Sequence, residues 1–588
     1  MRIAVLLRDR CQPKRCSSEC MHYCPPVRTG TETIVMGDSG KPVISEELCV
    51  GCGICVHKCP FEAVKIIGLP QELEGETVHQ FGKNSFRLYR LPVPRKGQVI
   101  GLLGPNGIGK STATSILSGQ VVPNLGDYSS DATWDKVLDK YSGTELHDYL
   151  KPLAEGSIKT AIKPQYVDKL PAVHKGKVRE LLEKVDDEGG LDEISERLMI
   201  TSVLSRDLAK LSGGELQRVA LAATLLRDAD VYFFDEPSSY LDIFQRLEVA
   251  KVIQELSTRK QVVVIEHDLA VMDFLADLVH IMYGSEGAYG IISQPRSVRS
   301  AVNVYLDGYM REENIRFRDT AIKFEKRPPR GDWQSEPLIE FTELKKRFRN
   351  FSLRVSGGVI RKGEVVGAVG PNATGKTTFV KMLAGEVSPT AGSVKGEVTV
   401  SYKPQYIKPE FDGTVKELLY QTVGRDIDAG FFQAEVERPL SLKYLMDNEV
   451  KKLSGGELQR VAIAVCLGKQ ADIYLLDEPS AYLDSAQRMT ASKTIRRVVE
   501  KSGKSAVIVD HDVYMIDLIS DSLMVFSGEA SKRGVGEGPM AMRDGMNRFL
   551  RDVDITFRRD HETNRPRINK KDSRLDREQK SKGEHYYG

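Results

Sequence analysis

The sequence predicts an α/β fold in which two P-loop domains follow each other, preceded by a small cysteine-rich α+β domain. Two observations support this prediction: a set of motifs occurs twice in the same order, and eight of the nine cysteines precede residue 60. We expect the cysteine-rich domain over 1–73 and the two P-loop domains over 74–290 and 336–530. The remaining residues, 291–335 and 531–588, are expected to form a first and a second hinge segment.

Composition places the chain among ordinary globular proteins. Its 588 residues carry 84 basic and 82 acidic side chains, and apolar residues make up 41%. These values exclude a wholly disordered or fibrous chain, and the near-neutral charge argues against a uniformly basic nucleic-acid binder. The sequence lacks any apolar run long enough to span a membrane, and its first residues are too short in apolar core for a signal peptide. We therefore expect a cytoplasmic, multidomain protein without a membrane partner.

The cysteines form two groups with iron–sulfur spacing. The second group reads C-x2-C-x2-C-x3-C-P, the spacing of bacterial ferredoxins, and the first is a stretched version of it. In such proteins the fourth cysteine of a group ligates the neighbouring cluster. This crossover predicts two [4Fe–4S] clusters in a ferredoxin-like domain. The predicted ligands are Cys24, Cys49, Cys52 and Cys55 for one cluster, and Cys11, Cys16, Cys20 and Cys59 for the other.

Other interpretations of the cysteines stay open. Four thiolates in the irregular first group also suit tetrahedral zinc, whereas disulfides are disfavoured in a long chain without a secretion signal. The sequence contains no flavin or nicotinamide motif, so the clusters are expected to be structural or sensory. Cys466 lies in an apolar helical run and is expected to be a core residue.

Two stretches match the P-loop pattern G-x4-G-K-[ST], and each follows an apolar strand and opens a helix. The backbone N–H groups of such a loop surround phosphate oxygens, the lysine reaches the β- and γ-phosphates, and the hydroxyl helps to hold Mg²⁺. Ser111 and Thr377 are the predicted hydroxyl ligands. The expected ATP-binding residues are Gly104, Asn106, Gly107, Gly109, Lys110, Ser111 and Thr112, and then Gly370, Asn372, Gly375, Lys376, Thr377 and Thr378.

Further motifs repeat in the same order after each P-loop. The octapeptide LSGGELQR ends at Arg218 and again at Arg460, letter for letter. An apolar strand followed by Asp-Glu-Pro, a second strand followed by His-Asp, and Lys-Pro-Gln-Tyr also occur twice. An ordered set of this length indicates a duplicated domain with one function.

With these motifs the two halves resemble nucleotide-binding domains of the ATP-binding-cassette family. In that family two domains pack head to tail and clamp ATP between the P-loop of one and the signature sequence of the other. The resemblance implies one composite site that pairs Lys110 with Ser454 and Gly456, and another that pairs Lys376 with Ser212 and Gly214. The signature residues carried over are Ser212, Gly213, Gly214, Ser454, Gly455 and Gly456.

The resemblance also implies catalytic roles that fit the residue types, because phosphoryl transfer needs positioning and charge neutralisation. Two carboxylates would hold Mg²⁺, two would polarise water, two histidines would contact the γ-phosphate side, and two glutamines would sense metal and water. In that order the pairs are Asp235 and Asp477, Glu236 and Glu478, His267 and His511, and Gln165 and Gln405. Phe81 and Phe348 are the expected adenine-stacking residues, with Phe86 and Phe351 as competitors.

The two halves differ by an insertion. Lys110 and Gln165 are 55 positions apart, whereas Lys376 and Gln405 are 29 apart. Helical spacing on both sides of Ser142-Gly143 predicts a helix–turn–helix insert over about 130–155. The insert either binds a partner or covers the flank of its domain.

The two hinge segments also resemble each other. Residues 303–318 parallel 547–559, both stretches are rich in arginine, and further basic residues occur at 326–331 and 565–571. Three interpretations stay open: a hinge along the domain interface, a contact with phosphates, or a solvated tail.

The stretched first cysteine group in front of twin cassettes resembles the E subfamily of ATP-binding-cassette proteins, also called the RNase L inhibitor family. The resemblance spans essentially the whole chain. It implies a monomeric ATPase that splits ribosomes and stays on the small subunit, contacting rRNA, ribosomal proteins, release-factor-like proteins and initiation factors. The alternatives are the ATPase subunit of a membrane transporter and a redox enzyme driven by ATP.

Overall fold

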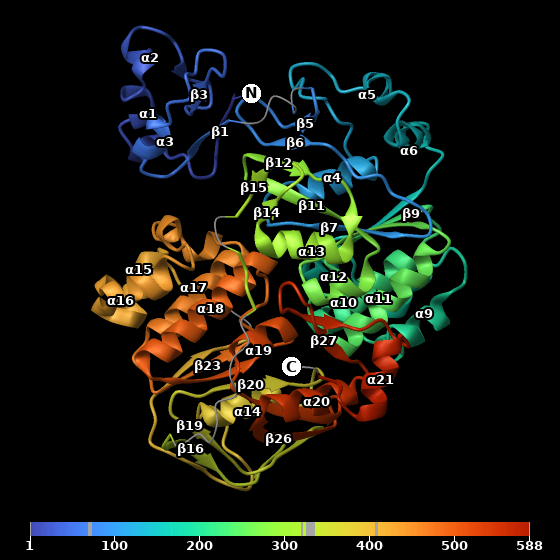
Figure 1. The fold of residues 1–588 in the computed structure, drawn as a ribbon, viewed down its shortest axis with the longest axis vertical. Coiled ribbons are helices and arrows are strands. Elements are labelled where there is room, and N and C mark those ends of the chain that lie inside the picture. The colour runs from blue at the N-terminus through green and yellow to red at the C-terminus, as the bar shows by residue number, and fades with distance from the viewer. Residues whose placement is uncertain are drawn as a thin grey trace.

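The computed structural model describes residues 2–68, 73, 75–165, 167–318, 321–324, 335–405 and 410–586. In chain order these form the cysteine-rich domain, the first P-loop domain, the first hinge segment, the second P-loop domain and the second hinge segment (Figure 1). Residues 68–76, where the cysteine-rich domain joins the first P-loop domain, lie partly outside the described residues, and the basic stretch 326–331 lies wholly outside them.

The cysteine-rich domain is built from two short antiparallel strand pairs and short helices. Strand β1 (Arg2–Leu6) pairs with β4 (Val64–Gly68), and β2 (Ile34–Met36) pairs with β3 (Pro42–Ile44). The helices carry or adjoin cysteines and are η1 (Pro13–Arg15), α1 (Glu19–His22), α2 (Pro25–Arg28) and α3 (Ile54–Lys58).

The cysteine-rich domain is anchored on the first P-loop domain. Asn84 Nδ2 donates to the carbonyl oxygens of Ala4 (2.8 Å) and Ile44 (3.0 Å), and Arg87 forms a salt bridge with Glu46 at 2.8 Å. Asn84 is buried, so these bonds lie inside the contact between the two domains.

The first P-loop domain contains a mixed sheet whose centre is parallel. The parallel strands run in the order β11-β7-β10-β9-β8, and β12, β6 and β5 continue the sheet beyond β11. Strands that are buried on both faces read as continuous apolar runs, as β7 does. The bounds are β5 (Thr77–Gln80), β6 (Arg87–Tyr89), β7 (Val99–Leu103), β8 (Thr160–Lys163), β9 (Val231–Asp235), β10 (Gln261–Ile265), β11 (Leu278–Ser285), β12 (Tyr289–Ile292) and β13 (Arg296–Ser297).

Helices of the first P-loop domain follow the strands whose ends carry the motifs. They are α4 (Lys110–Leu117), α5 (Trp134–Tyr141), α6 (Glu145–Ala154), η3 (Val167–Lys169), α7 (Leu170–Val173), α8 (Val178–Glu183), α9 (Leu191–Arg197), η4 (Thr201–Val203), η5 (Leu208–Lys210), α10 (Gly213–Leu225), α11 (Ile243–Ser257) and α12 (Leu269–Leu275). Helices α5 and α6 lie where the sequence predicts the helix–turn–helix insert.

The second P-loop domain repeats the parallel centre, in the order β25-β20-β24-β23-β22. Its strands are β16 (Pro337–Phe341), β17 (Leu344–Arg347), β18 (Ser352–Val355), β19 (Gly358–Arg361), β20 (Val365–Val369), β21 (Val394–Lys395), β22 (Val400–Lys403), β23 (Ile473–Asp477), β24 (Ser505–Val509), β25 (Ser522–Glu529) and β26 (Arg533–Ala541). Its helices are α14 (Lys376–Leu383), α15 (Val415–Val423), η6 (Gly424–Asp428), α16 (Gly430–Phe432), the π-helix η7 (Gln433–Glu437), η8 (Lys443–Leu445), η9 (Val450–Lys452), α17 (Gly455–Gly468), α18 (Ser485–Ser502) and α19 (Val513–Ile519).

A helix and a strand hairpin follow each P-loop domain. After the first come α13 (Val298–Asp307) and the pair β14 (Tyr309–Met310) and β15 (Ile315–Arg316). After the second come α20 (Met542–Asp552), the pair β27 (Phe557–Arg559) and β28 (Pro566–Ile568), and α21 (Arg574–Lys582). The sheets extend past the boundaries expected at residues 290 and 530, because β12 and β13 pair with β11, and β26 pairs with β25.

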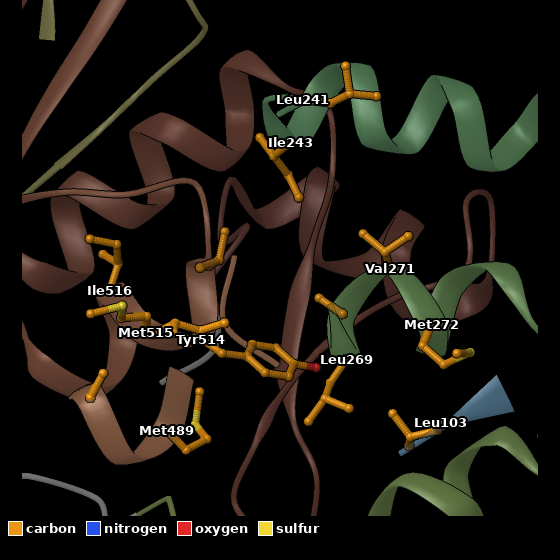
Figure 2. Packing of buried hydrophobic residues seen from close by; sticks show 14 of the residues in the cluster. Leu103, Leu241, Ile243, Leu269, Val271, Met272, Met489, Tyr514, Met515 and Ile516 are labelled. Atoms are coloured by element: carbon orange, nitrogen blue, oxygen red, sulfur yellow. The ribbon is translucent and has the colours of Figure 1, made fainter. Parts of the chain in front are cut away.

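The two P-loop domains share one buried apolar cluster. It contains Leu241 and Leu269 from the first domain and Met489, Tyr514 and Ile516 from the second (Figure 2). A continuous core of this kind resists separation of the domains, because separation would expose apolar surface to water. Within the described ranges no helix is long and apolar enough to cross a membrane.

Candidate active sites

Each P-loop turns tightly between a buried strand and a helix. Lys110 Nζ donates to the carbonyl oxygens of Gly104 (2.9 Å) and Pro105 (2.7 Å), and Lys376 Nζ forms the equivalent pair of bonds. A side chain at Gly104 would come within 2.4 Å of a backbone oxygen, so the turn requires glycine there. Burial lowers the pKa of both lysines to about 8, which leaves them charged at neutral pH.

The predicted catalytic residues of the first P-loop domain converge on Glu236. Gln165 Nε2 donates to Glu236 Oε1 at 2.6 Å, and His267 Nε2 lies 3.6 Å from the same oxygen. Burial, followed by the charges of Lys110 and Arg488, lowers the pKa of His267 well below its usual value, so the imidazole is neutral. The carboxylate is thus held by neutral groups and remains available to orient water.

The second P-loop domain reproduces this arrangement. Gln405 Nε2 donates to Glu478 Oε1 at 2.7 Å, and His511 Nε2 lies 3.5 Å from that oxygen. Burial raises the pKa of Glu478, but the nearby imidazole of His511, the charge of Lys376 and the hydrogen bond from Gln405 outweigh it and bring the pKa to about 2. Both glutamates have a positive φ of 48°, an uncommon conformation that directs the two side chains in the same way.

The donor sets suit Mg²⁺. Asp235 and Asp477 end strands β9 and β23 beside the P-loop hydroxyls Ser111 and Thr377, and burial raises the pKa of both carboxyls to about 6. A hard divalent cation prefers oxygen ligands of this type and would offset the cost of burying the charge.

The signature serines begin helices. Ser212 and Ser454 are the N-caps of α10 and α17, and each forms a capping box with the glutamate three residues later. The N-terminus of a helix carries partial positive charge, so both segments can face phosphate.

One cavity of about 540 Å³ joins the two P-loop domains. Its wall includes the first P-loop, Glu236, Gln165 and His267 on one side and Ser454, Gly455 and Gly456 on the other. The expected pairing of Lys110 with Ser454 and Gly456 therefore corresponds to a real space between the domains.

Reciprocal bonds at the interface match the head-to-tail arrangement. Asn106 N–H donates to Asp484 Oδ2 (3.2 Å), and Asn372 N–H donates to Asp242 Oδ2 (2.9 Å). Tyr240, which precedes Asp242 by two residues, packs against the signature glycines, and its carbonyl accepts from Asn372 Nδ2. The loop after Glu236 thus brings the segment of Ser212 and Gly214 to the second P-loop.

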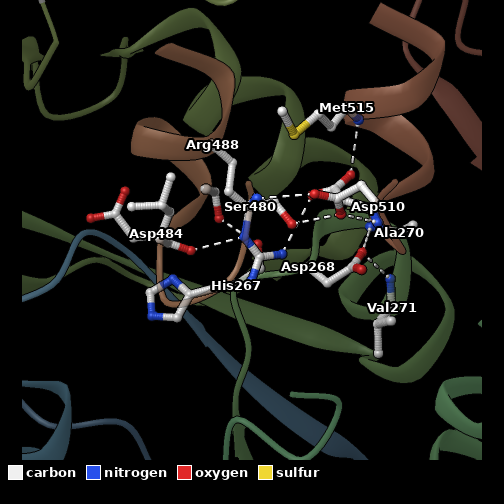
Figure 3. A network of polar contacts seen from close by, with 12 residues as sticks. His267, Asp268, Ala270, Val271, Ser480, Asp484, Arg488, Asp510 and Met515 are labelled. Atoms are coloured by element: carbon white, nitrogen blue, oxygen red, sulfur yellow. Dashed lines mark hydrogen bonds and ion pairs between the residues drawn. The ribbon is translucent and has the colours of Figure 1, made fainter. Parts of the chain in front are cut away.

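These interface residues lie outside the residues predicted from the sequence motifs. Between the two sites, Arg246 pairs with Asp268, Arg488 lies 3.4 Å from Asp512, and Arg488 also feels the charge of Asp268 across the interface. Figure 3 shows Arg488 among Asp268, Ser480, Asp484 and Asp510. A signal was present, because Leu-Asp-x-x-Gln-Arg ends at both Arg246 and Arg488.

The predicted stacking residues and their competitors differ in exposure. Phe81 is 59% exposed on the cavity wall and packs edge-on against His79, whereas Phe86 is wedged against Gly109. Phe348 is 44% exposed and stacks on Phe351 with ring centroids 6.4 Å apart. The exposed rings are therefore Phe81 and Phe348.

The cysteines gather in the two predicted sets. Cys11, Cys16, Cys20 and Cys59 line one small cavity, and Cys24, Cys49, Cys52 and Cys55 line another. Burial, with the neighbouring thiols, raises the pKa of Cys20 to about 11 and that of Cys55 to about 12. Across the described residues no three His, Cys, Asp or Glu side chains are grouped to hold a single metal ion. A [4Fe–4S] cluster is larger than a single ion, so its four cysteine ligands lie further apart than the ligands of one metal ion.

The insert and the second hinge segment both pack on the P-loop domains. Tyr149 of α6 donates its hydroxyl to the carbonyl of Leu117 at 2.5 Å, which fixes the insert to α4. Arg565 is fully buried, lies 3.4 Å from Asp273 of the first P-loop domain and contacts Tyr514 of the second. A solvated tail is therefore the wrong description of this arginine, because its charge is satisfied inside the interface.

Family models match the chain in the same order as its domains. A 4Fe-4S-like domain of RNase L inhibitor matches residues 1–32, a 4Fe-4S binding domain matches 42–65, and the ABC transporter model matches 94–239 and 354–481. Together with the paired sites, these matches define an ATP-binding-cassette ATPase with iron–sulfur binding domains at its beginning.

Full-length relatives narrow this class. The chain is 55% identical to an ABC transporter ATP-binding protein of Methanocaldococcus jannaschii and 46% identical to translation initiation factor RLI1 of Saccharomyces cerevisiae, covering 100% of this chain and 98% of each relative. The chain belongs to the E subfamily of ATP-binding-cassette proteins, the RNase L inhibitor family.

Solved structures agree with this assignment. A model of ribosome-bound archaeal Pelota and ABCE1 contains a chain with a TM-score of 0.96 and 53% identity, covering 100% of this chain and 99% of that one. The complex of archaeal ribosomal stalk protein aP1 and ribosome recycling factor aABCE1 has a chain with a TM-score of 0.83 and 54% identity, covering 88% and 100%.

Proposed function

We propose that this protein is an ATP-hydrolysing ribosome recycling factor, which splits ribosomes by closing its two P-loop domains on ATP and then stays on the small subunit. The observation that carries the proposal is the similarity over 100% of the chain to a protein in a ribosome-bound model and over 88% of the chain to a ribosome recycling factor. ATP bound and hydrolysed at the paired sites would supply the energy for splitting the ribosome.

The chemistry assigned to each site is hydrolysis of the γ-phosphate. Glu236 or Glu478 orients and polarises the attacking water, while Gln165 or Gln405 positions that carboxylate through the bonds described above. Asp235 with Ser111, and Asp477 with Thr377, would hold Mg²⁺, which when bound neutralises phosphate charge. Ser454 and Ser212 would approach the phosphates from the opposite domain, and Phe81 and Phe348 would stack on adenine.

ATP acts on the molecule by favouring the closed state. A ligand shifts a two-state equilibrium only by its differential affinity for the two states. A nucleotide held by both Lys110 and Ser454 binds the closed form more tightly, because opening removes one set of contacts. Movement of the P-loop domains would carry the cysteine-rich domain with it and place it between the ribosomal subunits.

The partners proposed are the small subunit, through its rRNA and ribosomal proteins, together with release-factor-like proteins and initiation factors. The insert formed by α5 and α6 offers one contact surface. Arg316, on an exposed hinge hairpin, offers another and can meet phosphate groups.

The cysteine-rich domain is proposed to hold two [4Fe–4S] clusters. Anaerobically purified protein should contain about eight irons and eight acid-labile sulfides. Cys59→Ser should remove the cluster assigned to Cys11, Cys16 and Cys20 and halve the iron, whereas Cys466→Ser should leave it unchanged. Zinc in place of iron and sulfide would contradict this assignment.

Light scattering of intact ribosomes tests the function. With ATP and a release-factor-like partner, the protein should lower the scattering as subunits separate. A variant carrying both Glu236→Gln and Glu478→Gln should bind the small subunit but fail to turn over. If ribosomes stayed joined while ATP hydrolysis responded to a membrane transporter, the alternative of a transporter ATPase subunit would replace this proposal.

A further inference from the structure

The cysteine-rich domain contacts one wall of the cavity between Lys110 and Ser454 directly, and it reaches the other wall through Tyr444. On the side of the first P-loop domain, Lys65 Nζ donates to Ser285 Oγ (2.9 Å) and to the carbonyl oxygen of Glu286 (2.7 Å). Glu286 forms part of the cavity wall and packs against the P-loop at Gly107. Burial lowers the pKa of Lys65, which agrees with an ammonium group enclosed in this contact.

The other contact reaches the second P-loop domain. The guanidinium of Arg10 lies 4.5 Å from the centre of the Tyr444 ring, within the range of a cation–π interaction. Tyr444 belongs to η8 of the second P-loop domain, whose helices α15 and α17 lie below the cysteine-rich domain in Figure 1. Arg10 directly precedes Cys11, so this contact lies next to one of the two cysteine sets in the sequence.

Tyr444 is connected to the signature helix. Arg460 Nη2 donates to the Tyr444 hydroxyl at 2.6 Å, and Arg460 Nη1 donates to the carbonyl oxygen of Leu440 at 2.9 Å. Arg460 is the last residue of the signature sequence, is buried, and lines the same cavity as Lys110. A continuous set of contacts therefore runs from Arg10 through Tyr444 to the nucleotide side of α17.

The described residues of the first P-loop domain contain no equivalent of this connection. Arg218 Nη1 donates to the carbonyl oxygen of Leu198, twenty residues earlier, as Arg460 does to Leu440. This common spacing aligns Tyr444 with Ser202, whose side chain is too short to replace the ring. The tyrosine is thus particular to the signature helix that faces the cysteine-rich domain.

We propose that the cysteine-rich domain is a bridge across the composite site of Lys110 and Ser454, with Arg10 and Tyr444 as positioning residues that set the signature helix for ATP. The first end of the bridge, Lys65, contacts Glu286 on one wall of the site. The second end, Arg10, reaches the opposite wall through Tyr444 and Arg460. They therefore link the position of the cysteine-rich domain to closure at this site. The inference rests on the proposed ATP sites and is independent of the ribosome.

The bridge acts on one site only. Helix α14, which begins at Lys376, lies at the opposite end of the molecule from the cysteine-rich domain in Figure 1. Removing the Arg10–Tyr444 contact should therefore change one ATP site and leave the other as it is.

The test measures ATP hydrolysis of the full chain, without ribosomes, in two backgrounds. Glu478→Gln leaves the site of Lys110 and Ser454 active, and Glu236→Gln leaves the other site active. In the first background, Arg10→Ala and Tyr444→Phe should each raise the KM for ATP by about 3- to 10-fold with a smaller change in kcat, since a cation–π or hydrogen-bond contact is worth about this factor.

In the second background the same two variants should have no effect. Combining them should raise the KM by less than the product of the single effects, because both act through one chain of contacts. Lys443→Thr, which gives the neighbouring exposed residue the side chain found at Thr201, is the matched control. Iron content and melting temperature verify that each variant is folded.

Equal effects in both backgrounds, or an unchanged KM in the first, would overturn the bridge. Failure of the proposed ATP sites would appear differently, because Glu236→Gln and Glu478→Gln alone would then leave hydrolysis unaltered. The two proposals are thereby tested separately.

Discussion

The two P-loop domains are alike at the reaction centre and different around it. In both, a lysine on the neighbouring strand (Lys163 or Lys403) donates to the carbonyl oxygens of the Asp-Glu pair. Around this centre, the first domain has the α5–α6 insert, the docked cysteine-rich domain and Ser239 beside Glu236, whereas the second has Ala481 at the aligned position. We therefore expect any difference in the rate of ATP hydrolysis between the two sites to arise from these surroundings.

Removal of each catalytic carboxylate tests whether the two sites hydrolyse ATP in the same way. Glu236→Gln and Glu478→Gln should each slow hydrolysis at their own site by about 10²- to 10⁴-fold, because each removes the carboxylate that polarises water. ATP binding should persist, since the amide keeps the shape. Single-turnover hydrolysis and equilibrium nucleotide binding measure the two quantities.

The signature serines provide the control for that experiment. With the site of Lys376 inactivated by Glu478→Gln, Ser454→Ala should slow the remaining hydrolysis and Ser212→Ala should not. The reverse result would place each serine in the site of its own domain and reject the head-to-tail pairing.

The hinge segments after the two domains supply the second test. Arg565→Met removes one charged partner of the buried Asp273, which keeps its bidentate contact with Arg567, and should lower the free energy of unfolding by about 1–3 kcal/mol. Arg316→Met removes an exposed arginine that lies over Tyr309, and its effect should stay within about 1 kcal/mol. Urea denaturation followed by fluorescence compares them, and equal midpoints would contradict the difference in burial.

The third test uses the strand-end carboxyls, which should behave alike in both domains. Burial raises the pKa of Asp235 and Asp477 from 3.8 to about 6. A raised carboxyl pKa means that the charged form is disfavoured in the folded state, so stability is lost as the pH rises from about 4 to about 6. Without nucleotide, Asp235→Asn and Asp477→Asn should therefore stabilise the protein above pH 6, each by at most about 3 kcal/mol.

The gain should shrink toward about pH 4, where the folded protein holds these carboxyls protonated. Melting temperatures at two pH values measure this dependence. With Mg²⁺ and ATP added, both variants should lose the ligand-induced increase in melting temperature. A gain that is independent of pH, or confined to one domain, would show that the two environments differ.

A smaller change in rate is expected from the residue that differs beside the two catalytic glutamates. Ser239 Oγ donates to Glu236 Oε2 at 2.9 Å, and Ala481 makes no such bond. Ser239→Ala should slow single-turnover hydrolysis at the first site by about 3- to 10-fold through poorer positioning of the carboxylate. Ala481→Ser, the reciprocal change, should alter the second site in the opposite direction, and identical rates in all four cases would remove this residue from the explanation.

Much of the local geometry of the motifs could be predicted from the sequence, since it depends on neighbouring residues. The P-loop glycines, the Asp-Glu at the end of β9 and β23 and the N-cap serines of α10 and α17 each lie within a short segment. Such a segment adopts its turn or cap wherever it occurs, because the required φ angles and hydrogen bonds involve neighbouring residues. The two cysteine sets that line separate cavities were likewise predictable, since the spacing within each group and the crossover of its fourth cysteine define them.

Other features depend on residues that are far apart in the chain. Asp484 meets Asn106 across 378 positions, and Arg565 meets Asp273 across 292, and periodicity gives no information on such pairs. The contact of Tyr444 with Arg10 depends on how the cysteine-rich domain packs on the second P-loop domain. Spacing alone does not single out Tyr444, because it occupies the same position relative to the signature sequence as Ser202 does in the first domain. Local sequence determined what each segment can bind. Packing of the shared core decided which segments face each other, because the apolar area buried there depends on contacts along the whole interface and not on any one segment.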